Sequence, residues 1–329
     1  MSRPYFSTII CNYNYGRFLR QGLESLLAQD FPAAEREIVV VDDGSTDDSI
    51  AVVESFKDKV RLFRQKNQKQ AGAFKTGYAE AKGEIFCLLD ADDFCEPGKL
   101  TAFAKAFEDP AIGLVQHYLR DVDENGRPLA NTLPRWPETY SLEDYLEGRC
   151  EDAATSGLAF RRDVLAKALP VPPQIFCWYD EFLISHALMH AKMANIPRVL
   201  GYHRIHGANN WAHRLGQPDK MEGYVEQGRL FFSHFEAALE PSGRALSPRF
   251  QAALDTDFSR SLILAAIYKG DRARAWELWH ALPSGSAGAR FRSAMLSLAL
   301  IHPGLYLSLY KFYENNPALR KAREALISG

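Results

Sequence analysis

The 329-residue sequence lacks the marks of several protein classes. Its five cysteines are scattered and include no C-x-x-C pair, which argues against a disulfide framework or a zinc knuckle and indicates reduced, cytosolic thiols. The formal net charge of -2 gives no electrostatic footprint for nucleic acid, so we expect no nucleic-acid partner. The chain opens without an apolar signal region, and no apolar run has the length needed to span a bilayer. We therefore expect a cytoplasmic protein, with peripheral binding to the inner face of the cell membrane as an open option.

One apolar run, residues 85–89, ends in the carboxylates Asp90, Asp92 and Asp93. Apolar residues bounded by charged neighbours predict a strand that is buried on both faces of a parallel sheet. The three carboxylates would repel one another unless a cation or hydrogen-bond donors lay between them. The pattern therefore indicates a divalent-metal site that is shared with a phosphate-bearing ligand. An acidic loop that only caps the next helix is the alternative.

Strands and helices alternate over the first hundred residues. Apolar, β-rich runs predict strands at 6–11, 37–41, 60–63 and 85–89, and helical spacing predicts helices at 18–27, 50–56 and 71–81. Ser45 or Thr46 is placed to cap the second of these helices. We expect an α/β fold with a doubly wound, mostly parallel sheet flanked by helices.

Polar loops follow the first, second and fourth predicted strands, and ligands bind beyond the carboxyl ends of the strands in such a sheet. Tyr13 offers a ring for a nucleobase, Asp43 an acceptor for an imide N–H, and Asp92 a ligand for a metal on a diphosphate. Neither G-x-G-x-x-G nor G-x-x-x-x-G-K-[ST] occurs in these loops, which argues against dinucleotide oxidoreductases and P-loop NTPases.

The order of these motifs resembles the family 2 glycosyltransferases of GT-A fold. The resemblance rests on four segments: residues 7–14, 37–47, 67–77 and 82–93. It implies inverting transfer from a nucleoside-diphosphate sugar, with Mg2+ or Mn2+, to a hydroxyl of a glycan or lipid-linked saccharide acceptor. Uracil and thymine present an imide N–H, which favours a UDP- or dTDP-linked donor, but guanine presents N–H groups too, so the base stays open.

The resemblance also assigns residues of the donor site. Tyr13 would stack near the base, Asp43 would hydrogen-bond it, Asp90 would lie near the ribose, and Asp92 would ligate the metal. Cys11 is counted with these donor-binding residues. Cys11 stands where the family commonly has Pro. Two further departures, Lys69 for Gly and Lys75 for Asn, are given no role because exposed lysines on a helix face are common.

The middle of the chain carries a candidate general base. Residues 178–183 resemble the segment where the family places this base at the start of a helix, which indicates Asp180, with Glu181 in reserve. Aromatic neighbours would raise the proton affinity of Asp180 by desolvation, which suits a base that accepts a proton from a hydroxyl. The alternative is that Asp180 only caps the helix. Residues 155–162 resemble the family's acceptor-lining strand, although a plain turn before a helix at 164–169 also fits.

Further predictions concern the segments around these motifs. Residues 114–126 suggest a hairpin, the proline-containing stretch 127–137 a linker or lid, and Ser141 the cap of a short helix at 142–146. Residues 202–210 resemble the stretch that closes the family's catalytic domain. By that resemblance His206 approaches the metal or diphosphate, and Arg204 is placed with the donor-binding residues and supports the loop.

The remainder of the chain predicts an all-helical extension. Apolar periodicity gives helices at 221–239, 250–270, 272–282, 294–301 and 305–313. The tail is basic and aromatic, so it suits either an anionic membrane surface or packing on the core or a second subunit; its basic residues are Arg290, Arg292, Lys311, Arg320, Lys321 and Arg323.

We therefore expect a GT-A catalytic domain at 1–212, with a nucleotide-sugar half at 1–120 and an acceptor half at 121–212, followed by a helical subdomain at 213–329. A nucleotidyltransferase would also use metal-binding carboxylates on an α/β sheet, but no basic glycine-rich triphosphate loop lies near Gly16. A non-catalytic module that binds a nucleotide sugar or glycan is the second alternative.

Overall fold

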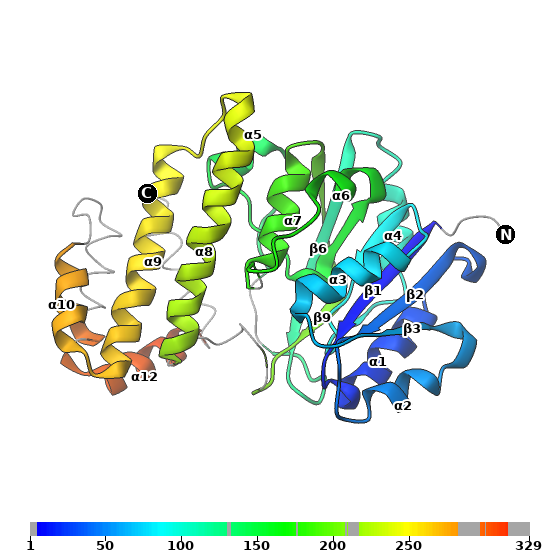
Figure 1. Cartoon of the computed structure of the whole chain (residues 1–329), viewed down its shortest axis with the longest axis horizontal. Helices are drawn as coiled ribbons and strands as arrows, with labels where there is room; N and C mark the ends of the chain where they lie inside the picture. Colours follow the sequence, from blue (N-terminus) through cyan, green and yellow to red (C-terminus); the bar gives the residue numbers. More distant parts are fainter. Residues whose placement is uncertain are drawn as a thin grey trace. The chain divides into compact units, whose positions relative to one another are not determined.

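The structure, a computed structural model, describes residues 5–129, 133–175, 177–207, 209, 217–281, 297–299 and 301–314 (Figure 1). The chain divides into two compact units. The first comprises residues 1–129 and 133–206, and the second comprises residues 130–132 and 207–329.

The first unit is a mixed α/β unit whose described residues form a nine-stranded, mostly parallel sheet, as the sequence predicts. The strands are β1 (Phe6–Asn12), β2 (Arg36–Asp42), β3 (Arg61–Arg64), β4 (Ile85–Leu88), β5 (Phe94–Cys95), β6 (Ile112–Val122), β7 (Thr139–Tyr140), β8 (Leu158–Arg161) and β9 (Lys192–Arg204). Their order is β3-β2-β1-β4-β8-β6-β9-β5, and β7 pairs with β9. β3, β2, β1 and β4 run parallel, whereas β8 is antiparallel to both β4 and β6.

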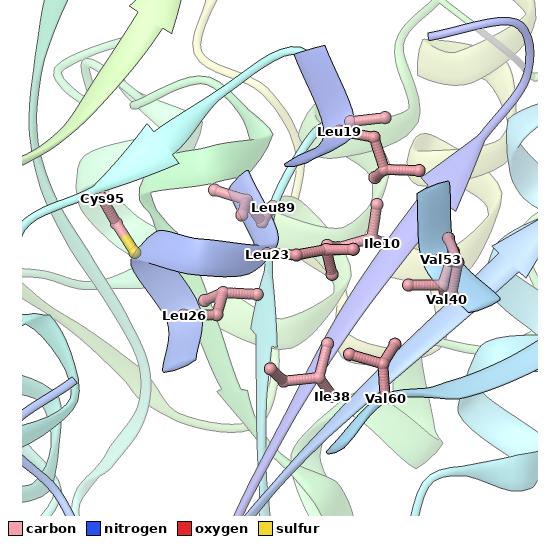
Figure 2. Packing of buried hydrophobic residues seen from close by; sticks show 11 residues of the cluster. Ile10, Leu19, Leu23, Leu26, Ile38, Val40, Val53, Val60, Leu89 and Cys95 are labelled. Carbon is pink, nitrogen blue, oxygen red and sulfur yellow. The ribbon is translucent and has the colours of Figure 1, made fainter. Parts of the chain in front are cut away.

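Helices cover both faces of the parallel strands, which explains why most residues of β1, β2 and β4 are buried. Leu23 and Leu26 of α1 (Gly16–Leu27) pack with Ile10 and Val40 of the sheet, as Figure 2 shows. α2 (Ser49–Glu54) contributes to the same cluster. α3 (Lys69–Glu80) packs on the side chains that alternate with these. A Cβ at Gly77 would lie 2.6 Å from the Ile9 side chain, so a glycine is needed for this close approach.

The second half of this unit adds four helices: α4 (Lys99–Ala106), α5 (Leu142–Leu146), α6 (Arg162–Ala168) and α7 (Tyr179–Leu188). The Ser141 cap of α5 is confirmed, because its hydroxyl accepts from the Asp144 amide within a full capping box. Residues 155–157 form a 3-10 turn before β8, so both the turn and the strand expected here are present.

Two local predictions differ from the structure. Ser45 and Thr46 do not cap α2: Asp48 occupies the N-cap position, and the Ser45 hydroxyl instead contacts the loop after β1. The hairpin expected at 114–126 is present only as a short turn, in which the Asp123 N–H donates to the Arg127 carbonyl and the Leu129 N–H to the Asp121 carbonyl, both at 2.8 Å, and Val122 bridges Pro128. Most of the strand before the turn, β6, pairs instead with β8 and β9.

The second unit is helical in its described residues. It contains α8 (Pro218–Leu239), α9 (Pro248–Lys269), α10 (Arg272–His280) and α12 (Pro303–Glu314), close to four of the five predicted helices. Half of the helix expected at 294–301 lies outside the described residues, and residues 297–299 and 301 of it are helical. All the basic tail residues except Lys311 also lie outside the described residues. Across the described helices, none combines the length and the apolar character that a membrane span requires.

Candidate active site

The loops after β1 and β2 are locked together by hydrogen bonds. The Asn12 side-chain amide donates to Asp42 Oδ2 at 2.9 Å and to the Ser45 hydroxyl at 3.1 Å. The Asn14 backbone N–H also donates to the Ser45 hydroxyl, at 2.9 Å. Tyr13, between the two asparagines, is left 46% exposed. The network therefore fixes the backbone around Tyr13 while its ring stays available for contact with a planar ligand.

Asp43 lies beside this network, buried and aligned by the loop after β3. Its Oδ1 accepts from the Gln65 side-chain amide at 2.7 Å and from the Gln68 backbone N–H at 2.8 Å. Cys11 lies close to Asp43 and Asp90, since burial and then the charges of these two carboxylates raise the pKa of its thiol. Three of the expected donor residues, far apart in sequence, are therefore neighbours in the structure.

The loop after β4 brings buried carboxylates close to one another. Burial, followed by the charges of Asp93, Asp92 and Asp180, raises the pKa of Asp90 well above its ordinary value. Burial and the charge of Asp92 also raise the pKa of Asp93 to about 6. Carboxylates whose pKa values are raised by burial and by neighbouring carboxylates form a site whose charge a bound cation would balance.

Asp92 and His206 form the candidate metal pair. Asp92 Oδ2 and His206 Nε2 are 2.9 Å apart, and the imidazole is fully buried between the rings of Tyr15 and Phe18. Among the described residues, no three His, Cys, Asp or Glu side chains form a metal-binding group. One carboxylate and one imidazole fit Mn2+ or Mg2+ when phosphate and water supply the remaining ligands, since such ions retain several non-protein ligands.

Arg204 supports the loop that carries Asp92. Its backbone N–H donates to Asp93 Oδ1 at 2.8 Å, and its Nε donates to the Asp92 carbonyl at 2.7 Å. Its terminal nitrogens donate to the Glu124 carbonyl at 2.8 Å and to Gln21 Oε1 at 2.7 Å. The side chain is 1% exposed. These contacts give Arg204 a positioning role, with its donors turned toward the protein.

Asp180 lies in the first turn of α7, where the sequence predicts the start of a helix. Its two carboxylate oxygens lie 2.7 and 2.8 Å from the Thr155 hydroxyl. Trp178 occupies the N-cap position and no side chain caps α7, so the capping alternative for Asp180 is not seen. Burial raises the pKa of Asp180 to about 6, although the Thr155 hydrogen bond opposes that shift. A carboxylate with this pKa is ionised at neutral pH and accepts protons more readily than an ordinary aspartate.

Glu181, the reserve candidate, is held away from this role. The Tyr145 hydroxyl donates to Glu181 Oε1. Asp152 hydrogen-bonds Glu181 as well, and burial together with that neighbour raises the pKa of Asp152 well above its ordinary value. Glu181 is therefore engaged by two hydrogen-bond partners within the protein, Tyr145 and Asp152.

Three contributors to the site were given no individual role in the sequence predictions. The Ser156 hydroxyl accepts from the Asp90 backbone N–H at 2.9 Å, and buried Lys99 donates from Nζ to the Ser156 carbonyl at 2.7 Å. His203 contacts Asp121 at 3.1 Å; burial opposes its protonation, but this contact and nearby aspartates raise its pKa to about 9. A histidine directly before Arg204 was a usable signal, whereas nothing in the sequence marks Lys99 as buried.

Comparisons with known proteins find similar sequences and similar folds. The model of the family described as glycosyl transferase family 2 matches residues 7–169. An uncharacterized glycosyltransferase of Nostoc sp. is 36% identical over 233 residues, which are 68% of this chain and 71% of the relative.

Two solved structures resemble the fold. One is TarS 1-349 of Staphylococcus aureus in complex with UDP, with a TM-score of 0.52, 18% identity, and coverage of 83% of this chain and 88% of that one. The other is the mannosyltransferase PcManGT of Pyrobaculum calidifontis in complex with GDP-Man and Mn2+, with a TM-score of 0.56, 20% identity, and coverage of 94% and 84%.

Proposed function

The chain belongs to glycosyltransferase family 2 and has the GT-A fold, and from this premise we propose an inverting, metal-dependent transfer from a UDP- or dTDP-linked sugar to a hydroxyl of a glycan or lipid-linked saccharide. One observation carries the proposal: Asp180, whose pKa burial raises to about 6, lies close enough to the acidic loop for its charge to raise the pKa of Asp90. A basic carboxylate and a site for a diphosphate-bound cation therefore share one edge of the sheet.

Asp180 is the proposed general base. Its ionised carboxylate takes the proton of the acceptor hydroxyl while the hydroxyl oxygen attacks the anomeric carbon on the face opposite the nucleotide. The bond between that carbon and the diphosphate oxygen breaks, so a single displacement inverts the configuration and needs no covalent intermediate. The Thr155 hydroxyl, 2.7 Å from one carboxylate oxygen, orients the base.

The donor residues divide into a base end and a diphosphate end. Tyr13, Cys11 and Asp43 belong to the proposed place of the nucleobase, and Asp90 is near enough to Cys11 to raise its pKa and near enough to Asp180 for its own pKa to be raised. Asp92 and His206 would hold Mg2+ or Mn2+, which when bound offsets the charge that develops on the departing nucleoside diphosphate. The Arg204 contacts keep the Asp92 backbone in place for this role.

The test is the stereochemistry of turnover. The protein is incubated with an α-linked UDP- or dTDP-sugar and Mn2+, with a saccharide acceptor, and the anomeric proton is followed by NMR. We expect a β-linked product and loss of turnover in EDTA. An α-linked product would contradict the single displacement, and full turnover in EDTA would contradict the metal role.

A further inference from the structure

We propose that the hydrogen bonds from Gln65 and Gln68 to Asp43 make the donor site prefer uracil or thymine, which donate a single N–H, over guanine. The inference rests on the proposed donor site, because Asp43 there faces the nucleobase. It assigns a role in specificity to Gln65, a residue at the end of β3 that has no part in the transfer chemistry itself.

The first step is the hydrogen-bonding capacity of the Asp43 carboxylate. A carboxylate oxygen has two lone pairs, so each oxygen accepts about two hydrogen bonds. Asp43 Oδ1 already accepts two, from the Gln65 amide at 2.7 Å and from the Gln68 backbone N–H at 2.8 Å. Among the described residues, no donor contacts Oδ2. One oxygen is therefore used within the protein, and the other is the acceptor left for a ligand.

The second step is the rigidity of this arrangement. The Thr76 hydroxyl of α3 donates to Gln65 Oε1 at 2.6 Å, which directs the Gln65 NH2 group toward Asp43. The Asp43 backbone N–H donates to the Asn12 carbonyl at 2.8 Å, so the main chain is fixed as well. Thr76, Gln65 and Asp43 thus form a relay that holds the carboxylate in one orientation.

The third step compares the bases. Uracil and thymine present a single imide N–H, which one carboxylate oxygen satisfies. Guanine presents N1–H and an N2 amino group side by side, and this pair matches both oxygens of a carboxylate in a two-bond fork. With Oδ1 saturated by Gln65 and Gln68, guanine would leave one donor without a good partner. Leaving a buried donor unsatisfied lowers affinity by roughly tenfold to a hundredfold.

The experiment measures UDP, CDP and GDP binding to the full chain by isothermal titration calorimetry with Mn2+. For the unmodified protein we expect UDP to bind roughly tenfold to a hundredfold more tightly than GDP. CDP is the size-matched control for UDP, because cytosine has no proton on N3 and should therefore bind weakly. The readout is the ratio of GDP to UDP affinity, which general damage to the site would leave unchanged.

Two variants test the relay. Gln65→Leu frees one lone-pair position on Asp43 Oδ1, so we expect weaker UDP binding and a higher GDP to UDP affinity ratio. Thr76→Val leaves Gln65 in place but releases its amide, and should raise the ratio to a smaller extent. Thr76→Ser keeps the hydroxyl and is the matched control, with the ratio of the unmodified protein.

Several results would overturn the proposal. Equal UDP and GDP affinity in the unmodified protein would remove the selectivity, as would CDP binding as tightly as UDP. If Gln65→Leu and Thr76→Val weakened UDP and GDP binding by the same factor, Gln65 would have a structural role and no role in selectivity. If neither UDP nor GDP bound, the donor site would itself be wrong, and the failure would belong to the proposed function as well as to this inference.

Discussion

Two acidic loops leave the same edge of the sheet, one after β2 and one after β4. Their carboxylates differ in their hydrogen-bond donors and in the direction of their pKa shifts. In the first loop the carboxylates meet donors: Asp42 accepts from the Asn12 amide and the Ser45 backbone N–H. Asp47 accepts from the backbone N–H groups of Gly16 and Ser49, and these bonds outweigh burial and lower its pKa. In the second loop, burial and mutual repulsion raise the pKa values of Asp90 and Asp93.

This difference distinguishes carboxylates that stabilise the fold from carboxylates that form a binding site. A carboxylate that accepts backbone N–H bonds stabilises the fold as an anion, and its removal costs stability. Buried carboxylates that face one another destabilise the ligand-free protein at neutral pH, so they indicate a site that gains when a cation binds. Asp43 belongs to both kinds, since one oxygen is bound within the protein and the other is available.

The largest expected effect tests Asp180, the carboxylate that links the second loop to the acceptor. Asp180→Asn should lower transfer by about 10²- to 10⁴-fold, because the amide cannot take the proton of the acceptor hydroxyl. Nucleotide binding measured by calorimetry should persist. Initial rates of product formation provide the measurement.

Glu181→Gln is the matched control for this substitution. Glu181 is the neighbouring acid, but Tyr145 and Asp152 already occupy it, so we expect a much smaller loss of transfer. The opposite ranking of the two variants would move the base role from Asp180 to Glu181.

The second prediction contrasts the two loops in stability. Asp42→Asn should lower the free energy of unfolding by about 1–3 kcal/mol, because one of its buried acceptors becomes a donor. Asp90→Asn should instead raise the free energy of unfolding in EDTA at pH 7, because it removes a carboxyl group whose ionised form burial and the neighbouring carboxylates disfavour. Urea denaturation of both variants measures the two signs, and loss of stability in both would erase the distinction.

The raised pKa of Asp90 also predicts how the stability of the folded protein depends on pH. The folded-state pKa of Asp90 is raised, so the folded protein holds its proton to higher pH than the unfolded chain does. The stabilisation from protonated Asp90 is therefore present at low pH and is lost as pH rises through the raised folded-state value. The Asp90→Asn variant should lack this contribution when denaturation is repeated across pH in EDTA.

The smallest expected effect is a shift in the pH–rate profile. Transfer should fall as pH drops through about 6, because Asp180 must be ionised to act as the base. Thr155→Val removes a hydrogen bond that lowers this pKa, so the acid limb should move to higher pH. Thr155→Ser keeps the hydroxyl and should keep the limb in place. An unchanged limb in Thr155→Val would remove Thr155 from the control of the base.

Features that depend on residues close together in the sequence could be predicted from it, whereas features that depend on contacts between distant residues could not. The parallel strands and the Ser141 capping box are local patterns, and both are confirmed. The cap assigned to Ser45 was wrong, because its hydroxyl prefers partners more than thirty positions away in the loop after β1. Capping rules consider only neighbouring residues, so they do not predict that a hydroxyl will bond to a distant loop instead.

The candidate site shows the same limit. Asp92 and His206 are 114 positions apart, and only a resemblance to a family could place them in one site. The roles of Lys99 and Ser156 depend on contacts between α4 and the turn before β8, which no periodicity predicts. The Gln65 bond to Asp43 likewise requires β2 and β3 to be placed side by side first.

The most direct test of the contrast between the loops is the calorimetric affinity for UDP in Mn2+ and in EDTA, measured on the unmodified protein, Asp92→Asn and Asp47→Asn. The account predicts that Mn2+ tightens UDP binding in the unmodified protein and in Asp47→Asn, whereas Asp92→Asn binds UDP equally weakly in both conditions. Asp47→Asn should still unfold at lower temperature, because its carboxylate holds Gly16 and Ser49. Mn2+ dependence that survived in Asp92→Asn, or that disappeared in Asp47→Asn, would contradict the assignment of the metal to the loop after β4.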